Sequence, residues 1–171
     1  YNHIRVTDSA ALAIDDCIGT GTVKGAAANG GWGGIAYVKD GTLTIQNGKF
    51  TGGTASTGGG AIVVEAGGEL NLYSGEISGN TVTSGKGGAI YIKSGGIVNI
   101  YGGTIKDNHV YSGNGGAIYV AAGGTLNLYG GTITGNAAST HGGGIYVEKG
   151  GTLNIHGAPI VTNNTAGGKA S

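Results

Sequence analysis

The sequence predicts an all-β fold, a right-handed parallel β-helix (β-solenoid) of about six coils, with 27–28 residues and three short strands in each coil. Three observations predict it. The chain repeats one pattern, so that Ile62, Ile90 and Ile118 lie 28 residues apart. Glycine makes up 41 of the 171 residues and recurs at fixed places in each repeat. Between the glycines, apolar and polar residues alternate with the period of a strand. The right-handed turn follows from the sterics of parallel crossovers.

Composition excludes several classes of function. Nine basic residues balance nine acidic ones, so we expect no electrostatic binding of nucleic acid. No apolar run approaches the roughly 20 residues that span a bilayer, so we expect no membrane insertion by this chain. Cys17 is the single cysteine, which rules out an internal disulfide. The chain contains no methionine, and we therefore expect a processed product or a piece of a longer protein.

We expect one domain over residues 1–171, with the elements in the following order. Residues 1–30 form an irregular first coil, in which alternating apolar residues such as Ile4 and Val6 indicate strands. Residues 31–164 form the regular coils, and residues 165–171 form a solvated tail. Each regular repeat contains three strand signals, such as those over 117–120, 126–129 and 132–136. Glycine pairs separate the strands because tight corners need positive φ angles.

Stacking the repeats aligns their apolar residues in columns, which predicts a continuous core. Burying each such side chain contributes roughly 1.5–3 kcal/mol. The second strand of each coil supplies pairs such as Leu126 with Leu128. The third strand supplies one column, which we expect to contain Ile77, Ile105, Ile133 and Ile160.

Two columns of asparagine run along the repeats. An inward asparagine at a corner can hydrogen-bond to its own turn and to the asparagines of the adjacent coils. We therefore expect a structural ladder at one corner, made of Asn80, Asn108, Asn136 and Asn163. A second column lies between inward residues of the second strand and should face outward; it contains Asn71, Asn99, Asn127 and Asn154.

Two tyrosine columns are the candidate binding residues. We expect the first to face outward on the first strand, with Tyr91, Tyr119 and Tyr146, headed by Tyr37 and interrupted by Val63. The second follows the second strand, with Tyr73, Tyr101 and Tyr129, and ends at Gln46 and His156. Exposed tyrosines can bind sugar rings or a protein partner. The alternative, which we favour, is that the rings only stabilise neighbouring coils, by about 0.2–1 kcal/mol per pair.

The chain offers no pattern typical of catalysis, metal binding or a cofactor. Asp15 and Asp16 are adjacent, so on a strand they would face opposite sides. The glutamates are scattered over different faces, and the histidines at 109, 141 and 156 lack the spacing of metal ligands. We therefore predict no catalytic residue, no metal site and no cofactor. Ice binding would need a regular threonine lattice, and Glu76, Lys106 and Pro159 break the columns in which it would lie.

The repeats resemble those of bacterial and archaeal surface β-helix proteins. Gly87-Gly-Ala-Ile90 and Gly115-Gly-Ala-Ile118 are similar to the GGA(I/L/V) element of chlamydial polymorphic membrane proteins. Ile105-Lys-Asp-Asn108 and Ile133-Thr-Gly-Asn136 are similar to their FxxN element, with Ile in place of Phe. The resemblance covers about five coils. It implies a secreted or surface-displayed β-helix, and many such proteins are adhesins or passenger stalks.

Together these features favour a non-enzymatic, structural or adhesive β-solenoid outside the cell or on its surface. The alternative is a carbohydrate-binding or polysaccharide-cleaving β-helix similar to pectate lyases. Expected partners are host or environmental glycans or surface proteins, and other copies of the chain. Strand-like residues begin at Ile4, so we expect a longer parent chain or another copy to cover the first coil. We expect Pro159 to take the place of Thr132 and to remove a hydrogen-bond donor from the last coil, whose first two strands remain regular. Copies could therefore stack head to tail into a filament, and the alternative is a fragment of a longer β-helix.

Overall fold

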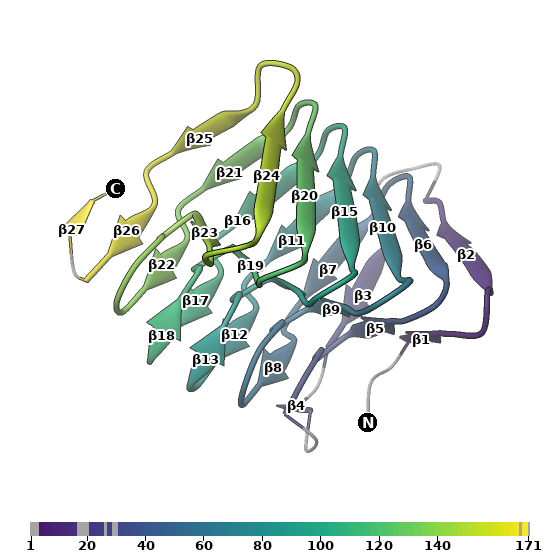
Figure 1. Cartoon of the computed structure of the whole chain (residues 1–171), viewed down its shortest axis with the longest axis horizontal. Coiled ribbons are helices and arrows are strands. Elements are labelled where there is room, and N and C mark those ends of the chain that lie inside the picture. The colour runs from purple at the N-terminus through teal and green to yellow at the C-terminus, as the bar shows by residue number, and fades with distance from the viewer. Residues whose placement is uncertain (1–3, 17–20, 26, 29–30, 168, 171) are drawn as a thin grey trace.

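The computed structural model describes residues 4–16, 21–25, 27–28, 31–167 and 169–170, and these wind through six stacked coils (Figure 1). Within these ranges the chain forms strands, turns and bends and no helix, which confirms the predicted fold class. Three parallel sheets of six strands run along the axis, each with one strand from every coil. The chain passes from sheet to sheet within a coil, so its neighbours along each sheet lie about one repeat away in sequence.

The first sheet contains β1 (Ile4–Val6), β5 (Ala36–Val38), β9 (Ile62–Val64), β14 (Ile90–Ile92), β19 (Ile118–Val120) and β23 (Ile145–Val147). The second contains β2 (Ala11–Ile14), β6 (Thr42–Ile45), β10 (Glu69–Leu72), β15 (Ile97–Ile100), β20 (Thr125–Leu128) and β24 (Thr152–Ile155). The third contains β3 (Thr22–Lys24), β7 (Lys49–Thr51), β11 (Glu76–Ser78), β16 (Thr104–Lys106), β21 (Thr132–Thr134) and β25 (Ile160–Thr162).

A fourth strand of two residues follows in each coil, beyond the three that we predicted. It forms a sheet of β4 (Ala27–Ala28), β8 (Thr54–Ala55), β12 (Thr81–Val82), β17 (His109–Val110), β22 (Ala137–Ala138), β26 (Thr165–Ala166) and β27 (Lys169–Ala170). The β27 strand turns back antiparallel to β26. The expectation of a solvated tail from residue 165 is therefore wrong, because β26 and β27 both pair in this sheet. A small bridge between β13 (Gly85–Lys86) and β18 (Gly113–Asn114) completes the pairing.

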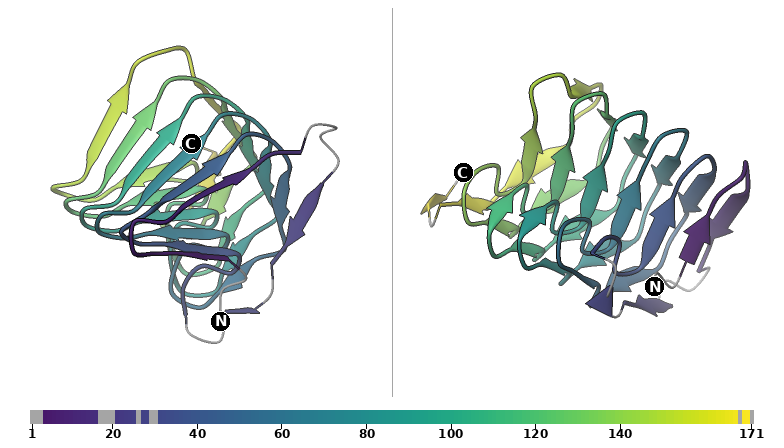
Figure 2. Two further views of the ribbon diagram at one scale, coloured as in Figure 1. Left: turned by 90° about the vertical axis from the view of Figure 1, so that its right-hand side faces the viewer. Right: turned by 60° about the horizontal axis from the view of Figure 1, so that its bottom comes forward.

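The coils wind around a common axis (Figure 2), and the core consists of the inward, buried side chains of the first three sheets. Inward residues of neighbouring coils lie directly above one another, as Leu70, Val98 and Leu126 do in the second sheet. These side chains are fully buried. The alternation that predicted the strands therefore also divides interior from surface along each strand.

The last coil departs from the expected third-strand column. Ile133 pairs with Val161, and Ile160 pairs with the outward Thr132 and is 56% exposed. In coils two to five the inward residue of the third strand follows the last inward residue of the second strand by five positions, as Ile133 follows Leu128, whereas in the last coil Val161 follows Ile155 by six. Pro159 therefore lies just before β25 and does not replace Thr132.

The Gly-Gly-Ala-Ile element has a specific steric cause. Gly87 has a φ of +69°, and a Cβ there would collide with the carbonyl oxygen of Ile90. A Cβ on Gly88 would collide with the carbonyl oxygen of Gly116 in the next coil. The first glycine therefore allows the corner, and the second allows neighbouring coils to approach closely.

Candidate functional site

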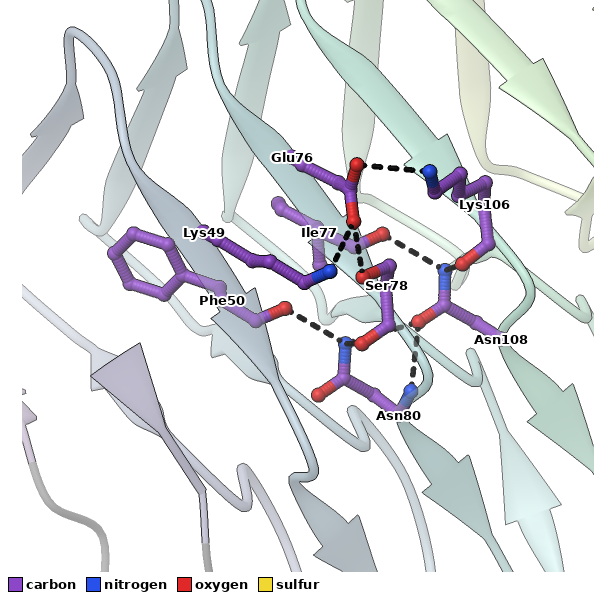
Figure 3. Close-up of polar contacts among 8 residues, drawn as sticks. All are labelled: Lys49, Phe50, Glu76, Ile77, Ser78, Asn80, Lys106 and Asn108. Carbon is purple, nitrogen blue, oxygen red and sulfur yellow. Dashed lines mark hydrogen bonds and ion pairs between the residues drawn. The ribbon is translucent and has the colours of Figure 1, made fainter. Parts of the chain in front are cut away.

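The inner asparagine column forms a buried hydrogen-bond ladder (Figure 3). The Nδ2 atom of Asn108 lies 2.9 Å from Oδ1 of Asn136, and also within hydrogen-bond distance of the carbonyl oxygens of Ile77 and Lys106. The backbone N–H of Asn108 donates to the same Oδ1 atom at 3.0 Å. Asn80 makes the equivalent bonds one coil earlier. Each side chain therefore connects three successive coils and closes its own corner.

The fourth member of this ladder is Asn164, and the prediction of Asn163 is wrong. Asn164 is 1% exposed, and its Oδ1 accepts bonds from the backbone N–H and Nδ2 of Asn136. Asn163 is exposed and has a φ of +55°, which asparagine tolerates better than most residues. The extra residue in the last corner shifts the repeat by one position, and two consecutive asparagines make the sequence alignment ambiguous there.

An ion-pair cluster lies on the outer face of the third sheet. The carboxylate of Glu76 lies 2.8 Å from Nζ of Lys49 and 2.9 Å from Nζ of Lys106, in the coils on either side (Figure 3). The Ser78 hydroxyl donates to it at 2.6 Å. Burial opposes ionisation, but these three donors outweigh it and lower the pKa of Glu76 from 4.5 to about 2.

The outer asparagine column also forms a ladder, on the second sheet. Nδ2 of Asn99 donates to Oδ1 of Asn71, Asn127 donates to Asn99, and Asn154 donates to Asn127, all at 2.7–2.8 Å. Glu69 accepts a further bond from Asn99 at 2.8 Å. These hydrogen bonds join side chains only, in contrast to the inner ladder.

The second tyrosine column is a stack of parallel rings beside this outer ladder. The ring centroids of Tyr73 and Tyr101 are 4.6 Å apart, those of Tyr101 and Tyr129 are 4.8 Å apart, and both pairs are inclined by 10°. His156 continues the stack at 4.7 Å from Tyr129. Tyr101 is 39% exposed. Because the ring faces cover one another, the middle of the stack presents ring edges and hydroxyl groups to solvent.

The first tyrosine column is less exposed than the second, and its middle ring is buried. Tyr119 is only 3% exposed. The ammonium group of Lys86, in the bridge before the first strand, lies 4.7 Å from the centroid of the Tyr119 ring and 5.9 Å from that of Tyr91. Burial raises the pKa of Tyr119, and the charge and hydrogen bond of Glu148 raise it further. Tyr146 stacks on Tyr119 at 5.0 Å.

The structure also brings together a cluster that the sequence analysis missed. The Tyr37 hydroxyl donates to the carboxylate of Glu65 at 2.6 Å, and Lys93 forms an ion pair with the same carboxylate. Nζ of Lys93 lies 3.7 Å from the ring centroid of Trp32. Burial and Glu65 together raise the pKa of Tyr37 to about 12. The spacing of 28 residues from Tyr37 to Glu65 and from Glu65 to Lys93, one repeat each, was the available signal.

Asp16 has local hydrogen-bond partners. Its carboxylate accepts a hydrogen bond from the backbone N–H of Gly21, and its carbonyl oxygen accepts one from Asn47. Asp15 lies in the exposed position directly after β2. Among the described residues no three His, Cys, Asp or Glu side chains form a group that could hold a metal ion. No helix in the same residues is long and apolar enough to cross a membrane. Cys17 lies outside them.

Comparison with known proteins agrees with this geometry. The family model described as the right-handed β-helix region matches residues 1–168 of the chain. No curated protein and no solved structure matches it significantly. The match covers all six coils, and the stacked parallel sheets are the architecture that the family describes. The chain belongs to the right-handed β-helix family.

Proposed function

We propose that this chain is a non-enzymatic, structural and adhesive segment of an extracellular or cell-surface protein. The observation that carries the proposal is that its outward side chains bind one another from coil to coil. The outer asparagine ladder, the tyrosine stack and the ion pairs of Glu76 all connect neighbouring coils. Such contacts stiffen a solenoid along its axis. The resemblance of the repeats to surface proteins supports the extracellular setting, and the proposal includes extension of the rod by further copies at its ends.

The electrostatics of the glutamates support a non-enzymatic role. A glycoside hydrolase needs a carboxylic acid whose pKa is raised, so that it holds a proton at neutral pH. Lysine and hydroxyl donors instead lower the pKa of Glu76 to about 2. At Glu65, burial alone would raise the pKa, but hydrogen bonds from Lys93 and Tyr37 lower it. Both groups therefore stay ionised and paired, as structural carboxylates do.

We propose that the adhesive surface is the strip on the second sheet, formed by the outer asparagine ladder and the tyrosine stack that begins at Tyr73. This strip offers phenol hydroxyls and ring edges in a line along the axis, beside an asparagine ladder in which Asn99 is only 7% exposed. An extended partner, either a glycan or a protein strand, could follow that line. Carbohydrate binding is the second candidate function, and the exposure of Tyr73, Tyr101 and Tyr129 favours it.

The proposal is tested by measuring attachment and turnover on the same purified chain. We expect attachment to some immobilised glycans or surface proteins, and no turnover of pectin, alginate or glycosaminoglycan with or without Ca²⁺. Tyr73→Ser combined with Tyr101→Ser should reduce attachment severalfold. Tyr111→Ser is the matched control, because Tyr111 is 62% exposed and lies outside the stack.

Two results would contradict this proposal. The first is polysaccharide turnover that disappears in Asp15→Ala or Asp16→Ala. The second is attachment that the Tyr73 and Tyr101 substitutions leave unchanged while the fold survives, as judged by circular dichroism. Antibody labelling of intact producing cells checks the extracellular setting.

A further inference from the structure

The tyrosine stack, formed by Tyr73, Tyr101 and Tyr129, holds three phenol rings face to face. Each ring directly follows a strand of the second sheet, and the residue before it pairs with its equivalent in the next coil. Backbone pairing therefore fixes the register of the rings. Their centroids are 4.6 and 4.8 Å apart, and neighbouring planes are inclined by only 10°. Each phenol thus has another phenol as its immediate neighbour.

The stacked rings are also accessible to reagents in solution. Tyr73 is 45% exposed, and Tyr101 and Tyr129 are each 39% exposed. A phenol that loses an electron reacts through its oxygen and through the ring carbons next to the hydroxyl-bearing carbon. These atoms lie at the end of a tyrosine ring that is farthest from the backbone. An oxidant in solution can therefore reach the atoms that react.

We propose that the stack is a site of oxidative modification, at which Tyr101 forms a dityrosine bond with Tyr73 or Tyr129 of the same chain. The oxidant is hydrogen peroxide, used by a haem peroxidase that takes one electron from each of two phenols. The inference goes beyond attachment and does not depend on it, because it concerns a bond within the chain.

The coupling consumes two phenols and one molecule of peroxide. Each phenol gives one electron to the peroxidase and its hydroxyl proton to water, which leaves a phenoxyl radical. The unpaired electrons of two neighbouring radicals form a carbon–carbon bond between the ring carbons next to the two oxygens. The hydrogen on each of these carbons then moves to the phenol oxygen, which restores the aromatic ring. The two electrons and two protons reduce the peroxide to two molecules of water.

Proximity favours coupling within one chain over coupling between chains. A radical on Tyr101 already has a second phenol at stacking distance on either side. Holding two reacting groups together removes the entropic cost of bringing them together from solution, and it raises the effective concentration of the partner far above that of a dilute protein. The expected product is therefore a monomeric chain with an internal bond.

The middle position makes Tyr101 the partner in every coupled pair of this stack. Tyr73 and Tyr129 belong to coils that are not adjacent, because the coil of Tyr101 lies between them. The other neighbour of Tyr129 is His156, whose ring lies 4.7 Å away. Substitution of Tyr101 should therefore abolish coupling, whereas substitution of either outer tyrosine leaves one pair.

The first tyrosine column provides an internal comparison. Tyr91 and Tyr119 meet edge to face, with centroids 5.6 Å apart and planes at 86°. Tyr119 stacks on Tyr146 at 5.0 Å, but Tyr119 is only 3% exposed. Burial keeps the oxidant away from the ring that both pairs share, so we expect this column to stay uncoupled.

A dityrosine bond joins two neighbouring coils covalently. Residues 73, 101 and 129 are 28 positions apart, so the bond closes a loop of one repeat. A covalent cross-link restricts the unfolded chain more than the folded one, in which the two rings are already neighbours. We therefore expect the coupled chain to melt at a higher temperature than the untreated chain.

Treatment of the complete folded chain with a haem peroxidase and hydrogen peroxide tests the inference. At low protein concentration we expect dityrosine fluorescence, a chain that remains monomeric in denaturing electrophoresis, and a mass lower by two hydrogen atoms. Trypsin places the three rings of the stack on separate peptides, because Lys93 lies between the first two and Lys106 between the last two. Mass spectrometry should find the peptide of Tyr101 linked to that of Tyr73 or Tyr129.

Phenylalanine variants assign the site while keeping a ring at each position. Tyr101→Phe should lower the yield of internal dityrosine at least about tenfold, since no two phenols of the stack remain adjacent. Tyr73→Phe and Tyr129→Phe should each keep a yield severalfold above that of Tyr101→Phe. The double variant with both outer substitutions isolates Tyr101 and should behave like Tyr101→Phe. Tyr111→Phe is the matched control and should leave the yield unchanged, because Tyr111 is 62% exposed and its ring contacts His109.

Several results would overturn the inference. One is an unmodified chain that forms no dityrosine, or forms it only between separate chains. Another is undiminished internal coupling in Tyr101→Phe or in the double variant while circular dichroism shows that the fold survives. A third is a linked peptide pair that joins Tyr91 to Tyr119 and not Tyr101 to its neighbours. Attachment is measured without peroxide, so each of these outcomes leaves the test of the proposed function unchanged.

Discussion

The two asparagine ladders have the same side chain, the same spacing and the same amide-to-amide bond, yet the structure uses them differently. Asn108 in the inner ladder is 1% exposed, and its side chain bonds to backbone groups of its own coil and of the preceding coil as well as to the neighbouring asparagines. Asn127 in the outer ladder is half-buried and bonds to neighbouring asparagines. We infer that the backbone partners of an asparagine column, and not the spacing of its side chains from coil to coil, decide how much the column contributes to stability.

The two tyrosine columns repeat this contrast. Tyr119 is covered by Lys86 and contributes to packing, whereas Tyr101 lies in an exposed stack. In both comparisons the more deeply buried side chain holds the fold together, and only the tyrosine stack is exposed enough to be the surface that we propose for a partner. Matched substitutions in the two columns of each pair test this distinction.

The largest expected effect is that of Asn108→Leu, compared with Asn127→Leu. Removing Asn108 leaves the backbone N–H of Asn80 without its acceptor and the carbonyl oxygen of Ile77 without its donor. Each unsatisfied buried group costs about 1–3 kcal/mol, so we expect a loss of about 3–5 kcal/mol in the free energy of unfolding. Asn127→Leu should cost less than about 1 kcal/mol. Urea unfolding of both variants measures the difference, and equal losses would refute the comparison.

A smaller difference is expected between Tyr119→Ser and Tyr101→Ser. Truncating the buried Tyr119 leaves a void, and we expect a loss of about 2–4 kcal/mol in the free energy of unfolding. Tyr101→Ser removes two stacking contacts at an exposed position and should cost about 1–2 kcal/mol. Attachment should follow the opposite order, with Tyr101→Ser reducing it more. Thermal melts and binding assays on the same samples measure both; a larger loss of attachment in folded Tyr119→Ser would contradict the assignment of the adhesive face.

The smallest expected effect is the pH dependence contributed by Glu76. Its pKa falls from 4.5 to about 2 on folding, so its ion pairs stabilise the fold fully above pH 4.5 and lose this contribution as the pH falls toward 2. Glu76→Gln should therefore have a shallower loss of thermal stability between pH 5 and 2 than the unmodified chain. Melting curves measured across this range test the expectation. Parallel curves for the two proteins would mean that Glu76 is not selectively stabilised as an anion.

The architecture is predictable from the sequence, because each repeat contains both the strand alternation and the corner glycines of one coil. Alternation within the strands assigned the interior residues, and the glycine pairs marked corners at which a Cβ would collide with backbone. The outer asparagine column and the second tyrosine column were also predictable, since residues one repeat apart must stack in register. Because each residue stacks on the residue one repeat away, the sequence repeat also predicts the tertiary contacts over most of the chain.

The positions at which the repeat is interrupted, and the outward residues that other side chains cover, are visible only in the folded structure. One extra residue before β25 moved the ladder from Asn163 to Asn164, which sequence spacing could not resolve between adjacent asparagines. Lys86 lies over the ring of Tyr119, and that ring is buried although the strand pattern alone places it outside. Trp32, Glu65 and Lys93 meet through side chains that reach across coils. A period assigns each residue to a column, but the length of a corner and the reach of a side chain decide what lies over that column.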